Sequence, residues 1–235
     1  MKRIKVIVPV ATSLWNESIR ELCEANKDCD TVIDIGNLDR GPEAIEQYYD
    51  DVWSELATLR EAERAEEEGY DGVVIYCFDD PAVRAAREKL HIPVIGLMEA
   101  SVHLASLLGR KFSIITTLEG GRFVSEDLLK VYGLEHKCTS IRVLGIKVLD
   151  LTDKARLEEA VLKTCEAAVK ADGADVLVFG CGSILGFKDR ISEEMGVPVV
   201  EPGVAALKIC EDLIQTKLTH SKRAYPTPPH IKRTN

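Results

Sequence analysis

The stretch Gly69–Ser101 reads GYDGVVIYCFDDPAVRAAREKLHIPVIGLMEAS. It begins with a short apolar run, Val73–Tyr76, which is followed at once by Cys77. A helical segment comes next and leads into a second apolar run, Val94–Leu97. Short continuous apolar runs are typical of strands buried on both faces, and a strand–helix–strand order is typical of parallel sheets. The stretch therefore predicts a βαβ unit with a cysteine at the carboxyl end of its first strand.

The same arrangement occurs again about a hundred residues later. GADVLVFGCGSI begins at Gly173, and GVPVVEPGVAA begins at Gly196. Cys181 follows Gly173 by eight residues, as Cys77 follows Gly69. The spacing from the cysteine to the proline of the next strand is 16 residues in the first case and 17 in the second. The chain therefore looks duplicated, and a pseudo-two-fold axis would relate the two cysteines.

The rest of the chain follows the same alternation of apolar runs and helical stretches. Residues 42–68 carry Ile45, Val52, Leu56 and Leu59 among many glutamates, and residues 153–171 have a similar helical period. We expect strands at Ile4–Val10, Thr31–Ile35, Val73–Tyr76, Val94–Leu97, Phe112–Thr116, Ser140–Val143, Val176–Phe179 and Val197–Val200. This pattern predicts an α/β fold of two pseudo-symmetric halves, each a mostly parallel sheet flanked by helices, with the active site in the cleft between them.

We expect residues 1–98 and 203–220 to form the first half and residues 99–202 to form the second. Residues 221–235 would be a C-terminal tail, and its basic residues are interpreted as solvated: Lys222, Arg223, Lys232 and Arg233.

Composition narrows the class of protein. The 235 residues carry a formal net charge of −9, which disfavours nucleic acid as a partner because an acidic chain repels phosphate. The apolar run after MKRIK is too short for a signal peptide and contains Pro9, and no stretch is long enough to span a membrane. Seven cysteines, an odd number, favour reduced thiols and a cytoplasmic protein. No CxxC or HExxH motif occurs, so we expect no metal site.

Cys77 and Cys181 are the candidate catalytic residues. Ligands of open parallel sheets bind at the carboxyl ends of the strands, where helix N-termini would also favour a thiolate. Inversion of a carbon stereocentre by proton transfer needs a base on one face and an acid on the other, and two facing thiols supply that pair with no cofactor. The alternative is that both are small core residues, the commonest fate of a buried cysteine.

Polar residues near the strand ends allow two interpretations. Thr12, Ser13, Thr116 and Thr117 are either local caps or hydrogen-bond donors to a substrate. Asp79-Asp80-Pro81 is interpreted first as an N-cap followed by proline at the start of a helix, with a substrate contact by Asp79 as the second interpretation.

The two cysteine motifs together resemble those of the aspartate/glutamate/hydantoin racemase superfamily, nearest its hydantoin and allantoin racemase branch. GPEAIEQYYD, from Gly41 to Asp50, resembles another segment of that branch. The resemblance implies two-thiol racemisation by Cys77 and Cys181 without a cofactor, a small-molecule substrate and a homo-oligomer. It also implies a substrate pocket lined by Ile45, Phe78, Asp79, Thr116, Thr117, Gly182 and Ser183. Thr12 and Ser13 are further candidates for this pocket because of their place at a strand end.

The sequence departs from that branch in two places. The loop Val8–Ser13 lacks the two asparagines of an Asn-Pro-Asn-Thr type loop, and the second motif continues Gly-Cys-Gly-Ser-Ile. Loss of polar loop groups changes which substrate atoms are held, so a hydantoin substrate is less firmly implied than the chemistry. The preferred function is racemisation of a 5-substituted hydantoin or allantoin. The alternatives are an aspartate or glutamate racemase, a maleate cis–trans isomerase, and a non-catalytic small-molecule binding protein.

Overall fold

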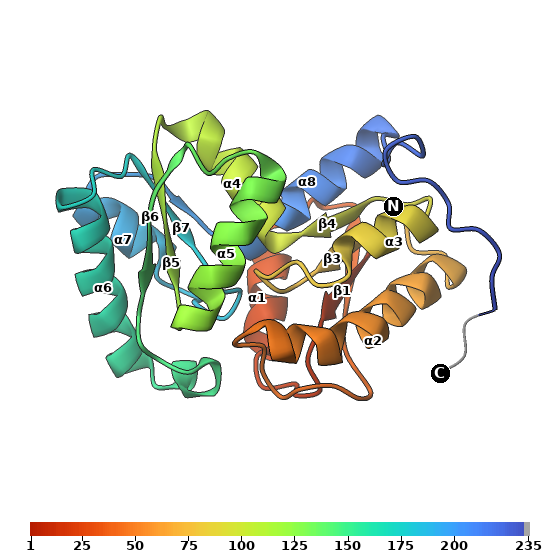
Figure 1. Cartoon of the computed structure of the whole chain (residues 1–235), viewed down its shortest axis with the longest axis horizontal. Coiled ribbons are helices and arrows are strands. Elements are labelled where there is room, and N and C mark those ends of the chain that lie inside the picture. The colour runs from red at the N-terminus through yellow and green to blue at the C-terminus, as the bar shows by residue number, and fades with distance from the viewer. Residues whose placement is uncertain (233–235) are drawn as a thin grey trace.

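The computed structural model describes residues 1–232, and they form two four-stranded parallel sheets that lie side by side (Figure 1). The first sheet has the order β2-β1-β3-β4 and the second has the order β6-β5-β7-β8. All eight predicted strands are present, with bounds that differ by a few residues. They are β1 Lys2–Val8, β2 Thr31–Asn37, β3 Gly72–Ile75, β4 Val94–Gly96, β5 Phe112–Thr116, β6 Cys138–Val143, β7 Val176–Phe179 and β8 Val199–Val200.

The two sheets repeat one topology. Strand β1 pairs in parallel with β2 and β3, and β5 pairs in the same way with β6 and β7. In each sheet the central strands are buried on both faces, which explains their continuous apolar runs. The equivalence of β3 with β7 confirms the two-halved α/β architecture that the duplicated motif predicts.

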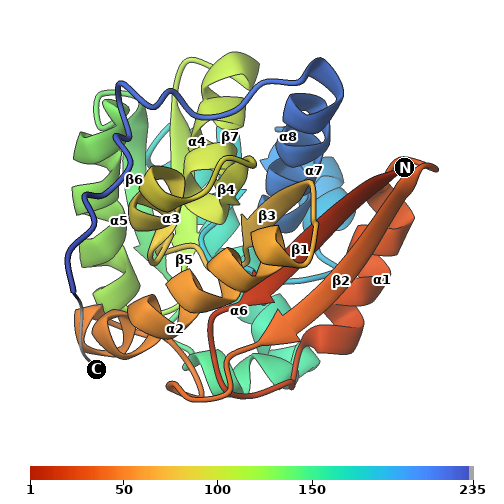
Figure 2. The same ribbon diagram turned by 90° about the vertical axis from the view of Figure 1, so that its right-hand side faces the viewer.

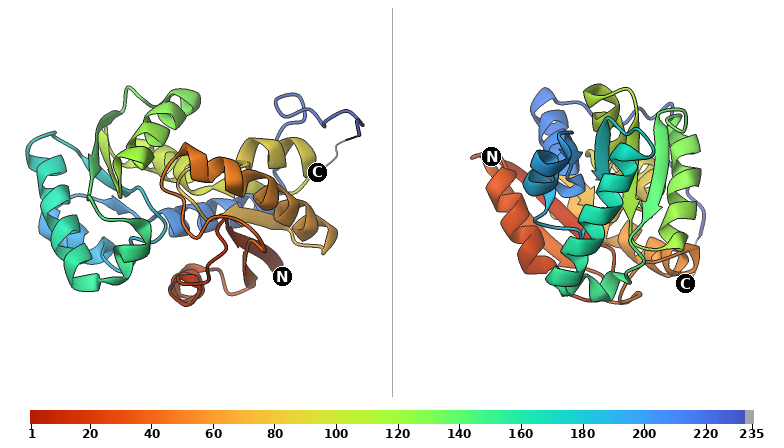
Figure 3. Two further views of the ribbon diagram at one scale, coloured as in Figure 1. Left: turned by 60° about the horizontal axis from the view of Figure 1, so that its bottom comes forward. Right: turned by 90° about the vertical axis from the view of Figure 1, so that its left-hand side faces the viewer.

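Helices cover both faces of each sheet. In the first half, α2 and α3 lie on one face, and α1 and α8 pack together on the other (Figure 2). In the second half, α6 and α7 pack together on the face opposite α5 (Figure 3). The helices are α1 Asn16–Asn26, α2 Tyr48–Glu67, α3 Val83–Lys89, α4 Leu97–Leu108, α5 Glu119–Tyr132, α6 Lys154–Lys170, α7 Lys188–Met195 and α8 Pro202–Thr216, with a 3-10 turn, η1, at Val148–Thr152.

Helices α4 and α8 join the halves. Each follows the last strand of one sheet and packs against the other sheet, α4 against β7 and α8 against β3 and β4. The two helices also pack on each other at the junction (Figure 1). One hydrophobic core consequently runs through both sheets. Within residues 1–232, no helix is long and apolar enough to cross a membrane.

Helix α2 differs from its expected form. It begins at Tyr48 rather than at residue 42, after Gln47 in an extended conformation. Its buried face consists of small and polar side chains, and the apolar Val52 and Leu56 are exposed. Small residues let this helix approach the sheet closely, so its core face carries little apolar signal.

The segment Thr219–Tyr225, called the C-terminal strap below, is bound to α3 and β4 (Figure 2). The Lys222 Nζ donates to the carbonyl oxygens of Arg87, Glu88 and Leu90 at 2.8, 2.9 and 2.6 Å. These carbonyls lie at the carboxyl end of α3, where they have no intrahelical partner. The prediction that Lys222 is solvated is therefore wrong, whereas Arg223 and Lys232 are exposed and Arg233 lies outside the described residues.

Candidate active site

Cys77 and Cys181 lie at equivalent ends of equivalent strands. Cys77 comes two residues after β3, and Cys181 comes two residues after β7. Both thiols are free and half-buried, and both line one cavity between the two halves. The cavity has a volume of about 60 Å³. That is roughly the space of four to six water molecules, so the site suits a small ligand.

The cavity wall is mostly apolar. The apolar contributions come from the loop after β1, from the start of α1 and from both cysteine loops. Among the described residues, the lining includes two carboxylates, Glu46 and Asp79, and no lysine, arginine or histidine. The full lining is Val8, Pro9, Val10, Trp15, Ile19, Ile45, Glu46, Tyr76, Cys77, Phe78, Asp79, Thr116, Thr117, Gly121, Val148, Gly180, Cys181, Gly182 and Ser183.

Most of the residues expected at the site line this cavity. Besides the two cysteines, these are Ile45, Phe78, Asp79, Thr116, Thr117, Gly182 and Ser183. Thr12 and Ser13 are not among the lining residues. Ser13 is exposed, and the Thr12 hydroxyl accepts a hydrogen bond from the Leu14 N–H at 3.3 Å, a local turn.

Sequence reasoning missed several lining residues. Val10 and Trp15 flank the loop that follows β1, so a search of strand ends for large apolar side chains would have found them. Val148 reaches the cavity from η1. The Val148 N–H donates to the Glu46 Oε1 at 2.8 Å, and this hydrogen bond holds η1 beside the cavity. No local pattern in the sequence indicates that contact between the halves.

The surroundings of Cys181 moderate the cost of its ionisation. Burial raises the pKa of Cys181 to about 11. The Ser183 N–H donates to the Cys181 Sγ at 3.5 Å. This hydrogen bond lowers the pKa of Cys181 and so offsets part of the effect of burial. A hydrogen bond to a thiolate stabilises its charge, so this loop contains a built-in donor for the ionised form.

The surroundings of Cys77 disfavour its ionisation more strongly. Burial raises the pKa of Cys77 well above its ordinary value, and the carboxylates of Asp79 and Asp51 raise it further, while the backbone N–H of Asp79 lowers it by less. The charge of a Cys181 thiolate acts in the same direction. The cavity thus favours one thiol and one thiolate over two thiolates.

The helices after the two cysteines begin later than expected. Helix α3 starts at Val83 and α7 starts at Lys188, so neither thiol lies at a helix N-terminus. The backbone prevents an earlier start, because Asp80 and Ala82 have φ of 49° and 60° and Gly186 has φ of 89°. The prediction that the N-termini of these two helices stabilise a thiolate is therefore wrong. The helices whose first turns line the cavity are instead α1, through Trp15 and Ile19, and α5, through Gly121.

Buried carboxyl groups surround the Cys77 loop. Burial raises the pKa of Asp51 and of Asp80 to about 7, and it raises that of Asp79 well above its ordinary value. Among the described residues, no group of three or more histidine, cysteine or carboxylate side chains is arranged to hold a metal ion.

Comparison with known proteins places this chain in a family. A model described as Asp/Glu/Hydantoin racemase matches residues 4–210. The chain is 35% identical over 228 residues to a hydantoin racemase of Pseudomonas sp. (strain NS671), covering 96% of this chain and 92% of that protein. It is 36% identical over 230 residues to a hydantoin racemase of Rhizobium meliloti, covering 97% and 95%.

A solved structure agrees with these sequence relatives. The structure of an allantoin racemase from Klebsiella pneumoniae is similar with a TM-score of 0.95 at 32% identity, covering 100% of this chain and 97% of that one. The resemblance expected from the two cysteine motifs is thereby confirmed over nearly the whole chain. The chain belongs to the Asp/Glu/hydantoin racemase family, and it is an isomerase of the racemase type.

Proposed function

We propose that Cys77 and Cys181 are the acid/base pair of a cofactor-independent racemisation. The observation that carries this proposal is that equivalent strand ends of the two halves bring both free thiols to one small cavity. A substrate held between them has one sulfur on each face of its stereocentre. That is the arrangement that proton transfer with inversion requires.

The two environments suggest the order of events. Cys181, with the Ser183 N–H at its sulfur, is the thiolate that removes the proton from one face of the carbon. Cys77, whose ionisation burial disfavours more strongly, is the thiol that gives its proton to the other face. Afterwards Cys77 is the thiolate and Cys181 is the thiol, which is the state that accepts the opposite enantiomer.

Negative charge that develops on the substrate needs stabilisation between the two transfers. The first-turn N–H groups of α5 have no intrahelical partners, and Gly121 brings that turn to the cavity. The Thr117 hydroxyl makes no hydrogen bond within residues 1–232 and is free to donate to a substrate oxygen, whereas the Thr116 hydroxyl donates to the Gly180 carbonyl at 3.3 Å. Gly182 and Ser183 complete this polar side, and Ile45 and Phe78 form the apolar side.

The absence of basic side chains from the described lining bears on the substrate. Aspartate, glutamate and maleate carry carboxylates, which would meet Glu46 and Asp79 and find no lysine, arginine or histidine in the wall. A cyclic ureide has no carboxylate, so its burial in this cavity costs less. Together with the names of the similar proteins, this favours a 5-substituted hydantoin or allantoin as the substrate.

Two further features belong to the proposal. Seven unpaired thiols suit a reducing compartment, so we place the protein in the cytoplasm. Exposed apolar side chains on α2, such as Trp53 and Leu56, offer a face for assembly into a homo-oligomer.

A solvent-exchange panel tests the function. The protein is incubated in deuterium oxide with single enantiomers of 5-methylhydantoin, allantoin, aspartate and glutamate, and with maleate. We expect deuterium incorporation together with loss of optical activity for a hydantoin or allantoin, with no cofactor added and at a rate above that without protein. Exchange only with an amino acid would overturn the substrate proposal, and fumarate formed from maleate would indicate the isomerase. No reaction with any compound would favour a binding protein.

A further inference from the structure

We propose that Asp80 is a positioning residue, whose carboxylate fixes the Cys77 loop to α4 and α5 and so sets Cys77 opposite Cys181. The proposal rests on the function proposed above for the two thiols. Asp80 itself does not line the cavity, and it acts through Cys77.

Both carboxylate oxygens of Asp80 are in use. Oδ1 accepts from the Met98 N–H at 2.9 Å, and Oδ2 accepts from the Glu99 N–H at 2.9 Å. Oδ2 also accepts from the Tyr132 hydroxyl at 2.7 Å. The side chain is 7% exposed, so these bonds are made away from water and their loss is costly.

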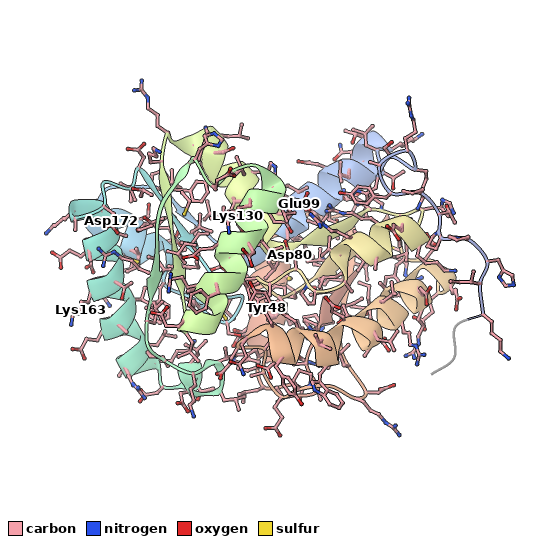
Figure 4. The ribbon with its side chains drawn as sticks, in the orientation of Figure 1. Tyr48, Asp80, Glu99, Lys130, Lys163 and Asp172 are labelled. Atoms are coloured by element: carbon pink, nitrogen blue, oxygen red, sulfur yellow. The ribbon has the colours of Figure 1, made fainter. Side chains whose placement is uncertain are left out.

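The three donors come from α4, which joins the halves, and from α5, which belongs to the second half. Met98 and Glu99 form the first turn of α4, and Tyr132 is the last residue of α5 in the second half. Figure 4 shows Asp80 and Glu99 close together between α5 and the first half. Asp80 therefore links a first-half loop directly to the second half, where Cys181 lies.

The backbone connects Asp80 to Cys77 over a short path. The Asp80 N–H donates to the Cys77 carbonyl at 3.2 Å. In this same loop Asp80 and Ala82 have φ of 49° and 60°, a left-handed conformation that costs roughly 1–2 kcal/mol for each residue with a side chain. Such a conformation persists only where the surroundings hold it, and the carboxylate of Asp80 is the group that does so.

The sequence leaves room for this link. A Cβ at Gly96 would lie 2.3 Å from the Asp80 Oδ1, so glycine is required opposite the carboxylate. The equivalent loop in the second half has no such carboxylate link, because Ile184 stands in place of Asp80 and Glu201 stands in place of Gly96. Arg87 further secures the site by an ion pair with Glu99 at 2.5 Å and by a hydrogen bond to Tyr225 at 3.3 Å.

The test compares Asp80→Asn, Tyr132→Phe and the control Glu211→Gln. Glu211 is fully buried and accepts from the Asp28 N–H at 2.8 Å and the Thr31 hydroxyl at 2.5 Å, but it does not line the cavity. Iodoacetamide labels the folded proteins, and peptide mass spectrometry gives separate rates for Cys77 and Cys181. The kcat and KM for the active hydantoin or allantoin and the midpoint of thermal unfolding are measured alongside.

We expect Asp80→Asn to raise the labelling rate of Cys77 about threefold or more while that of Cys181 changes less than about twofold. The kcat should fall about 10- to 100-fold with little change in KM, because a small displacement of an acid or base impairs the reaction more than binding. Tyr132→Phe removes one donor without changing charge, so it should act in the same direction with a smaller effect. Glu211→Gln should lower only the thermal midpoint.

The opposite pattern would overturn the proposal. Asp80→Asn or Tyr132→Phe would then lower the thermal midpoint, as Glu211→Gln does, and leave Cys77 labelling and kcat unchanged. If Asp80→Asn fails to fold, Tyr132→Phe decides alone. An inactive wild-type protein would contradict the proposed function, and the labelling rates would still report whether Asp80 positions Cys77.

Discussion

The loops after Cys77 and Cys181 leave equivalent strands, yet they surround their thiols with different groups. Phe78 and Asp79 follow the first thiol, and Gly182 and Ser183 follow the second. A backbone N–H near each sulfur lowers the pKa of its thiol, that of Asp79 for Cys77 and that of Ser183 for Cys181, but only the second loop adds a hydroxyl that acts in the same direction. Duplication thus explains why the thiols face one cavity. Divergence of the loops gives the two thiols different surroundings, which suits the proposed roles of one acid and one base.

Removal of either thiol should have the largest effect on activity of the changes considered for the two loops. In Cys77→Ser and Cys181→Ser we expect the rate of inversion to fall about 1,000-fold or more, since each variant loses one of the two proposed acid/base groups. Each should still exchange deuterium with retention for one enantiomer, because the remaining thiol can remove and return a proton on its own face. Polarimetry and proton NMR in deuterium oxide measure the two processes.

The exposed thiol of Cys29 provides the control for that pair. Cys29→Ser should leave both rates unchanged, because Cys29 does not line the cavity. Inversion that survives in either active-site variant would contradict the two-thiol mechanism.

Filling the space beside Cys181 is the next largest change. A Cβ at Gly182 would lie 2.6 Å from the Tyr76 Cε1 and 3.0 Å from the Leu97 Cδ1. Overpacking of a buried site typically costs about 1–3 kcal/mol, so Gly182→Ala should lower the thermal midpoint by several degrees. In Gly36→Ala the new methyl meets only the mobile end of Lys5 at 3.1 Å, and this control should change little. Equal midpoints for both variants in thermal unfolding would show that the Cys181 loop adapts.

Glu201 and Gly96 occupy equivalent positions before α8 and α4, and their difference has the smallest expected effect. Burial raises the pKa of Glu201 from 4.5 to about 8. A group with a raised folded-state pKa contributes stability that is fully present below the unfolded pKa and is lost as pH rises through the folded value. The wild-type thermal midpoint should therefore fall more steeply from about pH 5 to about pH 8 than that of Glu201→Gln.

The size of that difference follows from the chain length. A change of about 1 kcal/mol moves the midpoint of a domain of this size by about 2–4 °C. Asp51 and Asp80 also have raised pKa values, but they contribute equally to both proteins. Parallel midpoint-against-pH curves would mean that Glu201 is not the group responsible.

Much of the fold was accessible from the sequence, because strands buried on both faces leave continuous apolar runs. Helix α2 was only partly accessible. Its core face uses Ser54, Thr58 and Ala62, and its apolar Val52 and Leu56 line an open groove toward α5 instead. The division of the chain at residues 98/99 and 202/203 stays a prediction, although the packing of α8 on β3 and β4 supports it.

The candidate site was predictable where the duplication marks it. Cys77, Cys181 and their immediate neighbours fall at strand ends that the repeat makes recognisable. The contributions of Glu46, Val148 and Gly121 depend on how one half meets the other, and no local spacing encodes that. The link through Asp80 is of the same kind. The sequence Asp79-Asp80-Pro81 suggested that these residues cap the next helix, whereas Asp80 caps the N-terminus of α4, whose Met98 is 18 residues away.

The C-terminal strap has a practical consequence for the length of chain that folds well. A protein shortened to Thr216 would leave three carbonyls at the end of α3 without the Lys222 ammonium group, and Arg87 would lose Tyr225. Removing these residues to aid crystallisation, or fusing a tag directly after α8, would therefore remove the contacts that hold the carboxyl end of α3, the helix that follows Cys77. Fusions placed beyond Tyr225 spare that fastening.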